Sequence, residues 1–107
     1  MNRGEVWWIN FDPSVGGEIK KERPAVIVSN NAANRNLNRV QVVPITSNVS
    51  RIYPSEAMIT LQGRPGKVMA DQLTTVSKQR MREKAGEITS DEMTALELAI
   101  RLQLGLS

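Results

Sequence analysis

The sequence predicts a small, mainly β domain, either a barrel or a sandwich, followed by one C-terminal helix. Short runs rich in β-branched residues alternate with turns rich in Gly, Pro and Asn along most of the chain. After Ile88 the pattern changes to a helical period, and a capping box at Thr89-Ser90-Asp91-Glu92 marks the change. The 107 residues are expected to form a single domain, 1–107.

The predicted strands are short and are separated by polar loops. They comprise residues 4–11, 24–29, 39–46, 56–61, 67–70, 74–76 and 84–88. Pro24 and Pro44 each need a strand start, an edge or a bulge, because proline has no N–H to donate to a neighbouring strand. The Asn-rich stretch 30–38 is predicted as a loop with room for one helical turn, 63–66 as a turn and 78–82 as a short helical turn.

The C-terminal helix, predicted over 90–104, has two apolar faces. One face carries Met93, Leu96, Ile100 and Leu104, and the other carries Ala95, Leu98 and Leu102. A helix on the surface of a domain normally needs one apolar stripe. The second face therefore indicates either contact with a second copy of the chain or one unusually wide core face.

Two absences restrict the chemistry, since the chain has no His and no Cys. They exclude disulfides, thiolate nucleophiles, Cys/His zinc sites and catalysis that depends on a histidine base. Metal sites made of oxygen ligands remain open. The lack of Cys favours the cytoplasm, and the longest apolar runs are far shorter than the ~20 residues that span a bilayer.

The net charge of +3 is unevenly distributed. Residues 1–55 hold 7 Lys and Arg against 4 Asp and Glu, whereas residues 56–107 hold 7 of each. Clustered cations attract polyanions such as a nucleic acid or an acidic protein tail. The alternative is a solvated basic face without a partner.

Several residues have positions that are typical of functional sites, but each also has a structural interpretation. Trp7 and Trp8 are expected on opposite faces of the first strand, so that Trp8 either contacts a ligand or packs. Glu18 and Arg23 bound a glycine-containing loop, and Thr46 ends a strand. On spacing alone, these three are equally well explained as solvated charges and a strand terminus.

Four motifs occur along the chain in an order that points to a known protein family. They are Arg3-Gly4-Glu5-Val6-Trp7-Trp8 with Phe11-Asp12-Pro13; Gly16-Gly17-Glu18 followed by Arg23-Pro24-Ala25-Val26-Ile27-Val28-Ser29; Val43-Pro44-Ile45-Thr46-Ser47 with Tyr53-Pro54; and Ala70-Asp71-Gln72. In this order the sequence resembles the MazF/PemK family of toxin endoribonucleases from type II toxin–antitoxin systems. The resemblance implies an SH3-like barrel with a C-terminal helix, usually as a homodimer.

The resemblance also implies a reaction and its catalytic residues. The family cleaves single-stranded RNA at short sequence motifs without a metal ion or other cofactor, through attack of a ribose 2′-OH on the adjacent phosphorus. Arg23 matches the family's key arginine, and a guanidinium suits the negative charge that gathers on the phosphoryl oxygens. Thr46 matches a threonine that donates a hydrogen bond there. Glu18 matches a glutamate that some members use to accept the 2′-OH proton.

By the same resemblance, the RNA-binding surface is expected on the loops 12–22 and 47–54 and close to them. The candidate RNA-binding residues are Asn10, Gly17, Lys20, Lys21, Ser47, Tyr53 and Gln72. A cognate antitoxin with an acidic tail is the expected protein partner, and Trp8 is a candidate contact for it.

Two other functions remain open on the sequence. One is a protein-binding inhibitor like the related CcdB toxins, which share the fold but act on DNA gyrase. The other is a barrel that binds nucleic acid without cutting it.

Overall fold

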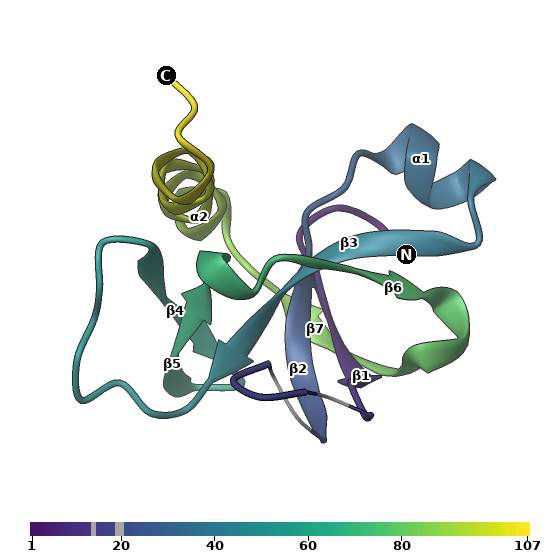
Figure 1. Ribbon diagram of the computed structural model, residues 1–107, viewed down its shortest axis with the longest axis horizontal. Helices are drawn as coiled ribbons and strands as arrows, with labels where there is room; N and C mark the ends of the chain where they lie inside the picture. Colours follow the sequence, from purple (N-terminus) through teal and green to yellow (C-terminus); the bar gives the residue numbers. More distant parts are fainter. Residues whose placement is uncertain (14, 19–20) are drawn as a thin grey trace.

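The computed structural model describes residues 1–13, 15–18 and 21–107 and is shown in Figure 1. Its strands are β1 (Glu5–Asn10), β2 (Glu22–Ile27), β3 (Arg39–Thr46), β4 (Glu56–Leu61), β5 (Arg64–Met69), β6 (Thr74–Ser77) and β7 (Met81–Glu87). Its α-helices are α1 (Asn31–Asn36) and α2 (Ser90–Leu104), and its 3₁₀ turns are η1 (Ala70–Gln72) and η2 (Lys78–Arg80). The prediction of a mainly β fold with a C-terminal helix is confirmed.

The strands form one curled antiparallel sheet, a half-barrel that α2 covers on one side (Figure 1). The order across the sheet is β4-β5-β3-β2-β1-β7, and β6 pairs with β3 beside this path. Two hydrogen bonds connect the C-terminal end of β4, the edge strand of the sheet, and the turn that follows it to β7 and α2. The Gln62 amide donates to the Ala85 carbonyl at 3.0 Å, and the Thr60 N–H donates to the Glu92 carboxylate at 2.7 Å.

Both faces of the sheet are buried, because neighbouring residues of one strand belong to two different apolar clusters. Val26 and Val43 pack with Leu96 of α2 in the first cluster. Ala25 and Ile27, the residues on either side of Val26, pack in the second cluster. This alternation is the period of two that a strand imposes on its side chains.

The predicted elements are present, but several of their bounds differ: β2 covers Glu22–Ile27 where 24–29 is predicted, and β7 covers Met81–Glu87 where 84–88 is predicted. β3, β4 and α2 have the predicted bounds. The turn predicted at 63–66 is instead the two-residue hairpin Gln62-Gly63, in which both residues have positive φ, 52° and 77°. Such turns match the twist of antiparallel strands, so β5 already begins at Arg64.

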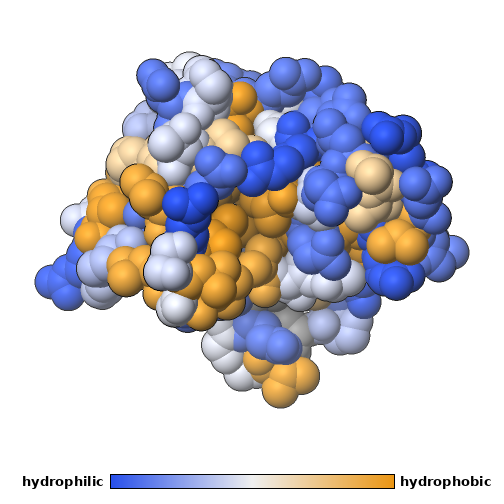
Figure 2. Space-filling model, turned by 90° about the horizontal axis from the view of Figure 1, so that it is seen from above, coloured by the Kyte–Doolittle hydropathy of each residue, from blue (hydrophilic) through white to orange (hydrophobic). Residues whose placement is uncertain are grey.

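Helix α2 begins at the predicted capping box and ends at Gly105, which has a left-handed φ of 70°. Its core face differs in part from the prediction, since Ala95 packs against the first cluster and Leu104 is 53% exposed. Leu98 and Leu102 are 60% and 58% exposed. Figure 2 shows apolar side chains gathering over the half of the molecule where α2 lies. Of the predicted second apolar face, Leu98 and Leu102 are thus exposed, whereas Ala95 belongs to the core face.

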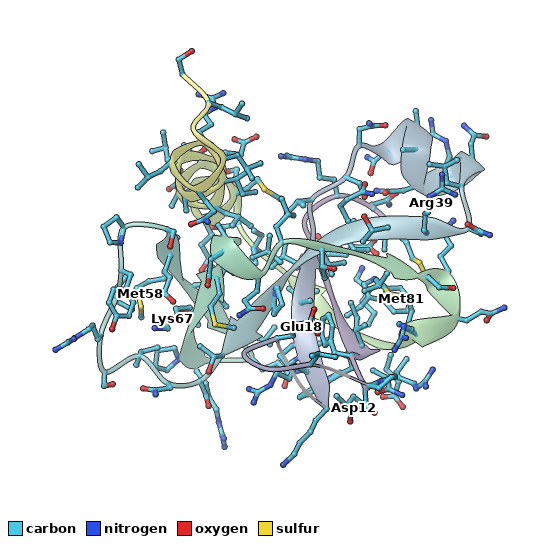
Figure 3. The ribbon with its side chains drawn as sticks, viewed as in Figure 1. Asp12, Glu18, Arg39, Met58, Lys67 and Met81 are labelled. Atoms are coloured by element: carbon cyan, nitrogen blue, oxygen red, sulfur yellow. The ribbon has the colours of Figure 1, made fainter. Side chains whose placement is uncertain are left out.

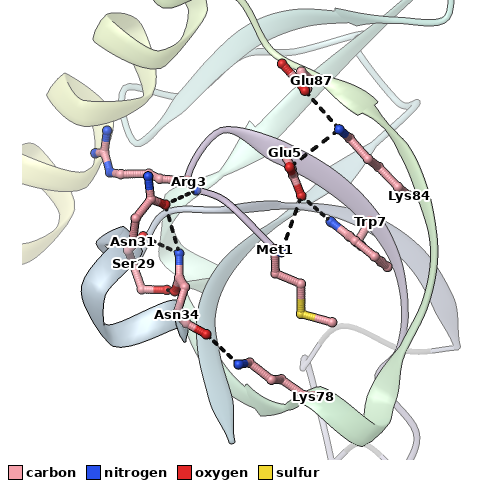
Figure 4. A network of polar contacts seen from close by, with 10 residues as sticks. All are labelled: Met1, Arg3, Glu5, Trp7, Ser29, Asn31, Asn34, Lys78, Lys84 and Glu87. Carbon is pink, nitrogen blue, oxygen red and sulfur yellow. Dashed lines mark hydrogen bonds and ion pairs between the residues drawn. The ribbon is translucent and has the colours of Figure 1, made fainter. Parts of the chain in front are cut away.

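A polar network fastens the first strand to the last (Figure 4). The Glu5 carboxylate accepts a hydrogen bond from the Trp7 indole at 2.9 Å and pairs with Lys84 at 3.4 Å. Burial alone raises the pKa of Glu5, but hydrogen bonds with Trp7 and the Asn2 backbone and the charge of Lys84 together lower it below its ordinary value of 4.5.

Candidate functional site

The two prolines lie where β2 and β3 separate. The pairing of these strands runs from Ile27↔Val42 to Ala25↔Pro44, and it ends there. Beyond this point β3 changes partner and pairs with β5 through Ile45 and Thr46. Since proline donates no backbone hydrogen bond, Pro24 and Pro44 favour the parting of the two strands at this position.

The register places the predicted arginine and threonine across this opening. The last β2–β3 pair is Ala25↔Pro44. If the same register is extended by two residues, Arg23 falls opposite Thr46, on the face of the sheet that Ala25 and Pro44 share. Each of these two residues is half-buried. In each of the motifs Arg23-Pro24 and Pro44-Ile45-Thr46, a proline favours the separation of the strands and a polar side chain lies next to the point of separation.

Arg23 and Thr46 line one cleft of about 540 Å³. Its other lining residues are Trp8, Glu22, Pro24, Ile45, Ser47, Leu61, Gln62, Arg64, Pro65 and Gly66. Two of the cleft residues, Arg23 and Arg64, are cations and only Glu22 is acidic, so the composition of the cleft suits an anion.

Thr46 is held in place from two sides. Its hydroxyl oxygen accepts a hydrogen bond from the Asn48 N–H at 3.3 Å, which leaves the hydroxyl proton to donate to another group. On the other side, Gly66 of β5 lies so close that a Cβ there would stand 3.3 Å from the Thr46 carbonyl and 3.1 Å from Ile45. Glycine therefore permits the close approach of β5 that positions the threonine.

Glu18 and Gln72 lie in a different hollow, here called the loop pocket, of about 370 Å³. Its lining residues are Phe11, Pro13, Glu18, Asp71, Gln72, Leu73, Thr74, Thr75, Val76 and Arg80. The Glu18 carboxylate accepts a hydrogen bond from the Val15 N–H at 2.7 Å, and the Gln72 amide donates to the Gly17 carbonyl at 3.2 Å. The structure thus brings Arg23 and Thr46 together and places Glu18 in the neighbouring pocket.

The base of the β1–β2 loop is braced by its own polar groups. The Asn10 side chain accepts from the Asp12 N–H at 3.0 Å, and the Asp12 carboxylate accepts from the Lys21 N–H at 2.9 Å. Arg80 donates to the carbonyls of Asn10 and Asp12 at 3.1 and 2.5 Å. Lys21 is exposed, and the predicted RNA-binding residue Lys20 lies outside the described residues.

The remaining predicted contacts lie at the cleft and on the loop that follows β3. Trp8 is 36% exposed and lines the cleft, as does the exposed Ser47. Tyr53 is 51% exposed, and its ring centroid lies 5.9 Å from the Arg51 guanidinium carbon.

Arg64 at the cleft and Lys67 beside it are not among the residues predicted from the sequence. Both belong to the half of the chain with a balanced charge, so the charge distribution drew attention away from them. In addition, the turn predicted at 63–66 includes Arg64, which in the structure is the first residue of β5.

Within the described ranges, no three acidic residues gather in a way that could hold a metal ion. In the same part of the chain, no helix has the length and apolar composition required to cross a membrane.

Comparisons with known proteins agree with this architecture. Residues 2–104 match the family described as PemK-like, MazF-like toxin of type II toxin-antitoxin system. A relative from Mycobacterium tuberculosis, named endoribonuclease MazF9, is 35% identical over 99% of this chain and 98% of its own length.

Two solved structures have the same fold. MazF from Deinococcus radiodurans superposes with a TM-score of 0.88 at 29% identity and covers 99% of this chain and 97% of its own. An endoribonuclease from a Mycobacterial species, solved in complex with its cognate antitoxin, has a TM-score of 0.85 at 29% identity over 100% of this chain and 97% of its own.

Proposed function

Because this chain belongs to the family of PemK-like, MazF-like toxins of type II toxin–antitoxin systems, we propose that it is an endoribonuclease that cuts single-stranded RNA in the Arg23–Thr46 cleft. The observation that carries the proposal is that Arg23 and Thr46 line the same cleft, at the point where β2 and β3 part. The relative named endoribonuclease MazF9 supports the activity.

The reaction is an internal transfer at phosphorus. The ribose 2′-OH loses its proton as its oxygen forms a bond to the adjacent phosphorus, the bond from phosphorus to the 5′-oxygen breaks, and the 5′-oxygen takes up a proton, so that the step has no net gain or loss of protons. The products are a 2′,3′-cyclic phosphate, or the 3′-phosphate after ring opening, and a 5′-hydroxyl. No metal ion or other cofactor takes part in the proposed reaction.

Arg23 and Thr46 stabilise the charge that develops during this transfer. The guanidinium of Arg23 presents forked donors to the non-bridging oxygens, and the Thr46 hydroxyl donates to the phosphoryl or the leaving oxygen. Since both residues lie near the ends of paired strands, the backbone that carries these donors is fixed before RNA binds.

Proton transfer contributes less than charge stabilisation in this proposal. Glu18 is exposed, holds its own loop through Val15 and lines the loop pocket. Acceptance of the 2′-OH proton by Glu18 stays a prediction, and we propose only a modest share for it.

The same surfaces fit the proposed protein partners. An acidic antitoxin tail would lie on the basic surface near Lys21 and Arg51, contact Trp8 and block RNA. The solved relative with its cognate antitoxin supports this partnership. A second copy of the chain would cover Leu98 and Leu102, which gives a homodimer. We place the activity in the cytoplasm, where cellular RNA is accessible.

RNA cleavage is tested directly by incubating the purified protein with a long RNA in EDTA and identifying the chemical ends of the products. We expect cuts at a short recurrent sequence, with cyclic phosphate and 5′-hydroxyl ends. A 2′-deoxy nucleotide at the cut site should block cleavage there, because it lacks the nucleophile.

Other outcomes would lead to other functions. Intact RNA across a broad set of sequences, together with inhibition of DNA gyrase, would favour a CcdB-like inhibitor. RNA binding without turnover would favour a non-catalytic barrel. Cutting at the 2′-deoxy position would reject the proposed nucleophile.

A further inference from the structure

Lys67 of β5 is buried, which is unusual for a lysine. It is 8% exposed and is the one buried cation among the residues that the structure describes. Burial of a charge is unfavourable unless the charge is paired and hydrogen-bonded. The Lys67 ammonium donates to the Glu56 carboxylate at 2.9 Å and to the Arg51 carbonyl at 2.7 Å.

These contacts fasten the segment between β3 and β4, residues 47–55, here called the β3–β4 loop. The same Glu56 oxygen that binds Lys67 also accepts from the Tyr53 N–H at 2.8 Å, and the Glu56 N–H donates to the Tyr53 carbonyl at 2.9 Å. The Lys67 ammonium lies 5.5 Å from the centroid of the Tyr53 ring. One ion pair therefore holds two backbone groups and one aromatic ring of this loop.

The ion pair also lies directly beside the proposed catalytic threonine. In the β3–β5 pairing, Thr46 stands opposite Lys67. Figure 3 shows Lys67 and Met58 together on the β4–β5 side of the molecule, with Glu18 near the middle. The β3–β4 loop leaves the sheet at Thr46 and returns at Glu56. Lys67 thus connects the start and the end of this loop.

We propose that the Lys67–Glu56 pair is a positioning device that sets the shape of the β3–β4 loop and thereby selects which nucleotides the cleft accepts. This inference rests on the proposed function. The loop carries Ser47 at the cleft and the exposed ring of Tyr53. Exposed aromatic rings stack on unpaired bases, and loop groups bind base edges, so the placement of this loop determines the preferred sequence.

The experiment compares three variants on a random-sequence RNA library, with sequencing of the cut sites and with kcat and KM on the preferred RNA. Lys67→Met removes the ammonium, and Glu56→Gln keeps the oxygen acceptor but removes its charge. Lys84→Met is the control on another strand, because it breaks ion pairs with Glu87 at 2.9 Å and with Glu5 at 3.4 Å, neither of which lines the cleft.

For Lys67→Met we expect a broader sequence preference and a KM about 10-fold higher, the size of effect that follows from loss of a charged hydrogen bond. The kcat should change by less than about 3-fold, because the loss falls on binding and the catalytic donors remain. Glu56→Gln should shift both quantities in the same direction but less. Lys84→Met should cut the same sequences as the wild type.

Lys67→Met leaves Glu56 buried without its partner, and this single variant risks failing to fold. The double variant Lys67→Met/Glu56→Leu removes both charges of the pair. It is expected to fold, since apolar replacement of a whole buried ion pair is often tolerated. Hydrogen exchange at the Tyr53 amide gives an independent readout and should accelerate, because its acceptor is lost.

Unchanged cut sites and an unchanged KM in the folded double variant would overturn the positioning role alone. Absence of RNA cleavage by the wild type would overturn the proposed function and, with it, this inference. The two failures are therefore distinguishable.

Discussion

The cleft and the loop pocket differ in how their functional groups are held. In the cleft, Arg23 and Thr46 belong to the ends of paired strands, and their backbone is fixed by the sheet. In the loop pocket, the polar groups of Glu18 and Gln72 are occupied with the loop itself, through Val15 and Gly17.

This difference indicates where charge is best stabilised. Electrostatic catalysis requires donors that are oriented before the reaction, and strand ends supply such donors with more precision than loops do. Side chains that hold a loop are better suited to shaping a binding surface. We therefore propose that catalysis takes place in the cleft and that both hollows bind RNA.

The largest effect is expected from Arg23→Ala, which removes the main cation from the cleft. Cleavage should fall by about 10³-fold, at the upper end of the loss seen when one charge-stabilising donor is removed. Arg23→Lys keeps the charge without the fork and should lose less. Single-turnover cleavage measures both. Activity of Arg23→Ala near that of the wild type would place catalysis outside the cleft.

Thr46→Val should lower the rate by about 10²-fold, because valine keeps the shape but has no hydroxyl to donate. Thr46→Ser keeps the hydroxyl and serves as the control, with most of the activity retained. The pair of variants separates loss of the donor from loss of packing. Equal rates for valine and threonine at this position would remove Thr46 from the mechanism.

Glu18→Gln tests the contribution of the loop pocket separately, since it changes that pocket and leaves the cleft intact. The rate should fall by less than 10-fold, below the roughly 10²–10⁴-fold share of an effective general base. The pH–rate profile is the measurement. A drop of about 10³-fold with loss of the acidic limb would show that Glu18 acts as the base and reaches the reacting atoms.

The smallest effect on activity is expected for Glu5→Gln, which lies in the β1–β7 network away from both hollows. Because folding lowers the pKa of Glu5, its contribution to stability is present above its ordinary value of 4.5 and is lost as the pH falls through the lower, folded-state pKa.

Urea unfolding at pH 7 and pH 3 tests this contribution. The variant should be less stable than the wild type at pH 7 by about 1 kcal/mol, and the difference should shrink at pH 3. A difference of the same size at both pH values would contradict the stated role of the carboxylate. Cleavage rates of the variant and the wild type should agree.

The strands, the helix and the candidate site residues Arg23 and Thr46 could be predicted from the sequence, but for different reasons. Alternating apolar residues and the capping box follow local rules and are visible in a single segment. Arg23 and Thr46 became candidates through the order of motifs, because spacing alone describes them equally well as strand ends. The structure adds the physical reason, which is the adjacent prolines.

Other features depend on contacts between distant residues and could not be predicted. The burial of Lys67 requires Glu56, from another strand, and the Arg51 carbonyl, from a loop. The separation of Glu18 from Thr46 depends on how the β1–β2 loop folds over η1, through the bond between Gln72 and Gly17. Neither arrangement leaves a periodic signal in the sequence.

The structure of the protein bound to an RNA with a 2′-deoxy nucleotide at the cut site tests the assignment of catalysis most directly. We expect the scissile phosphate to lie in the cleft, with its oxygens within hydrogen-bond distance of the Arg23 guanidinium and the Thr46 hydroxyl. A scissile phosphate seated in the loop pocket beside Glu18 and Gln72, with the cleft empty, would contradict it.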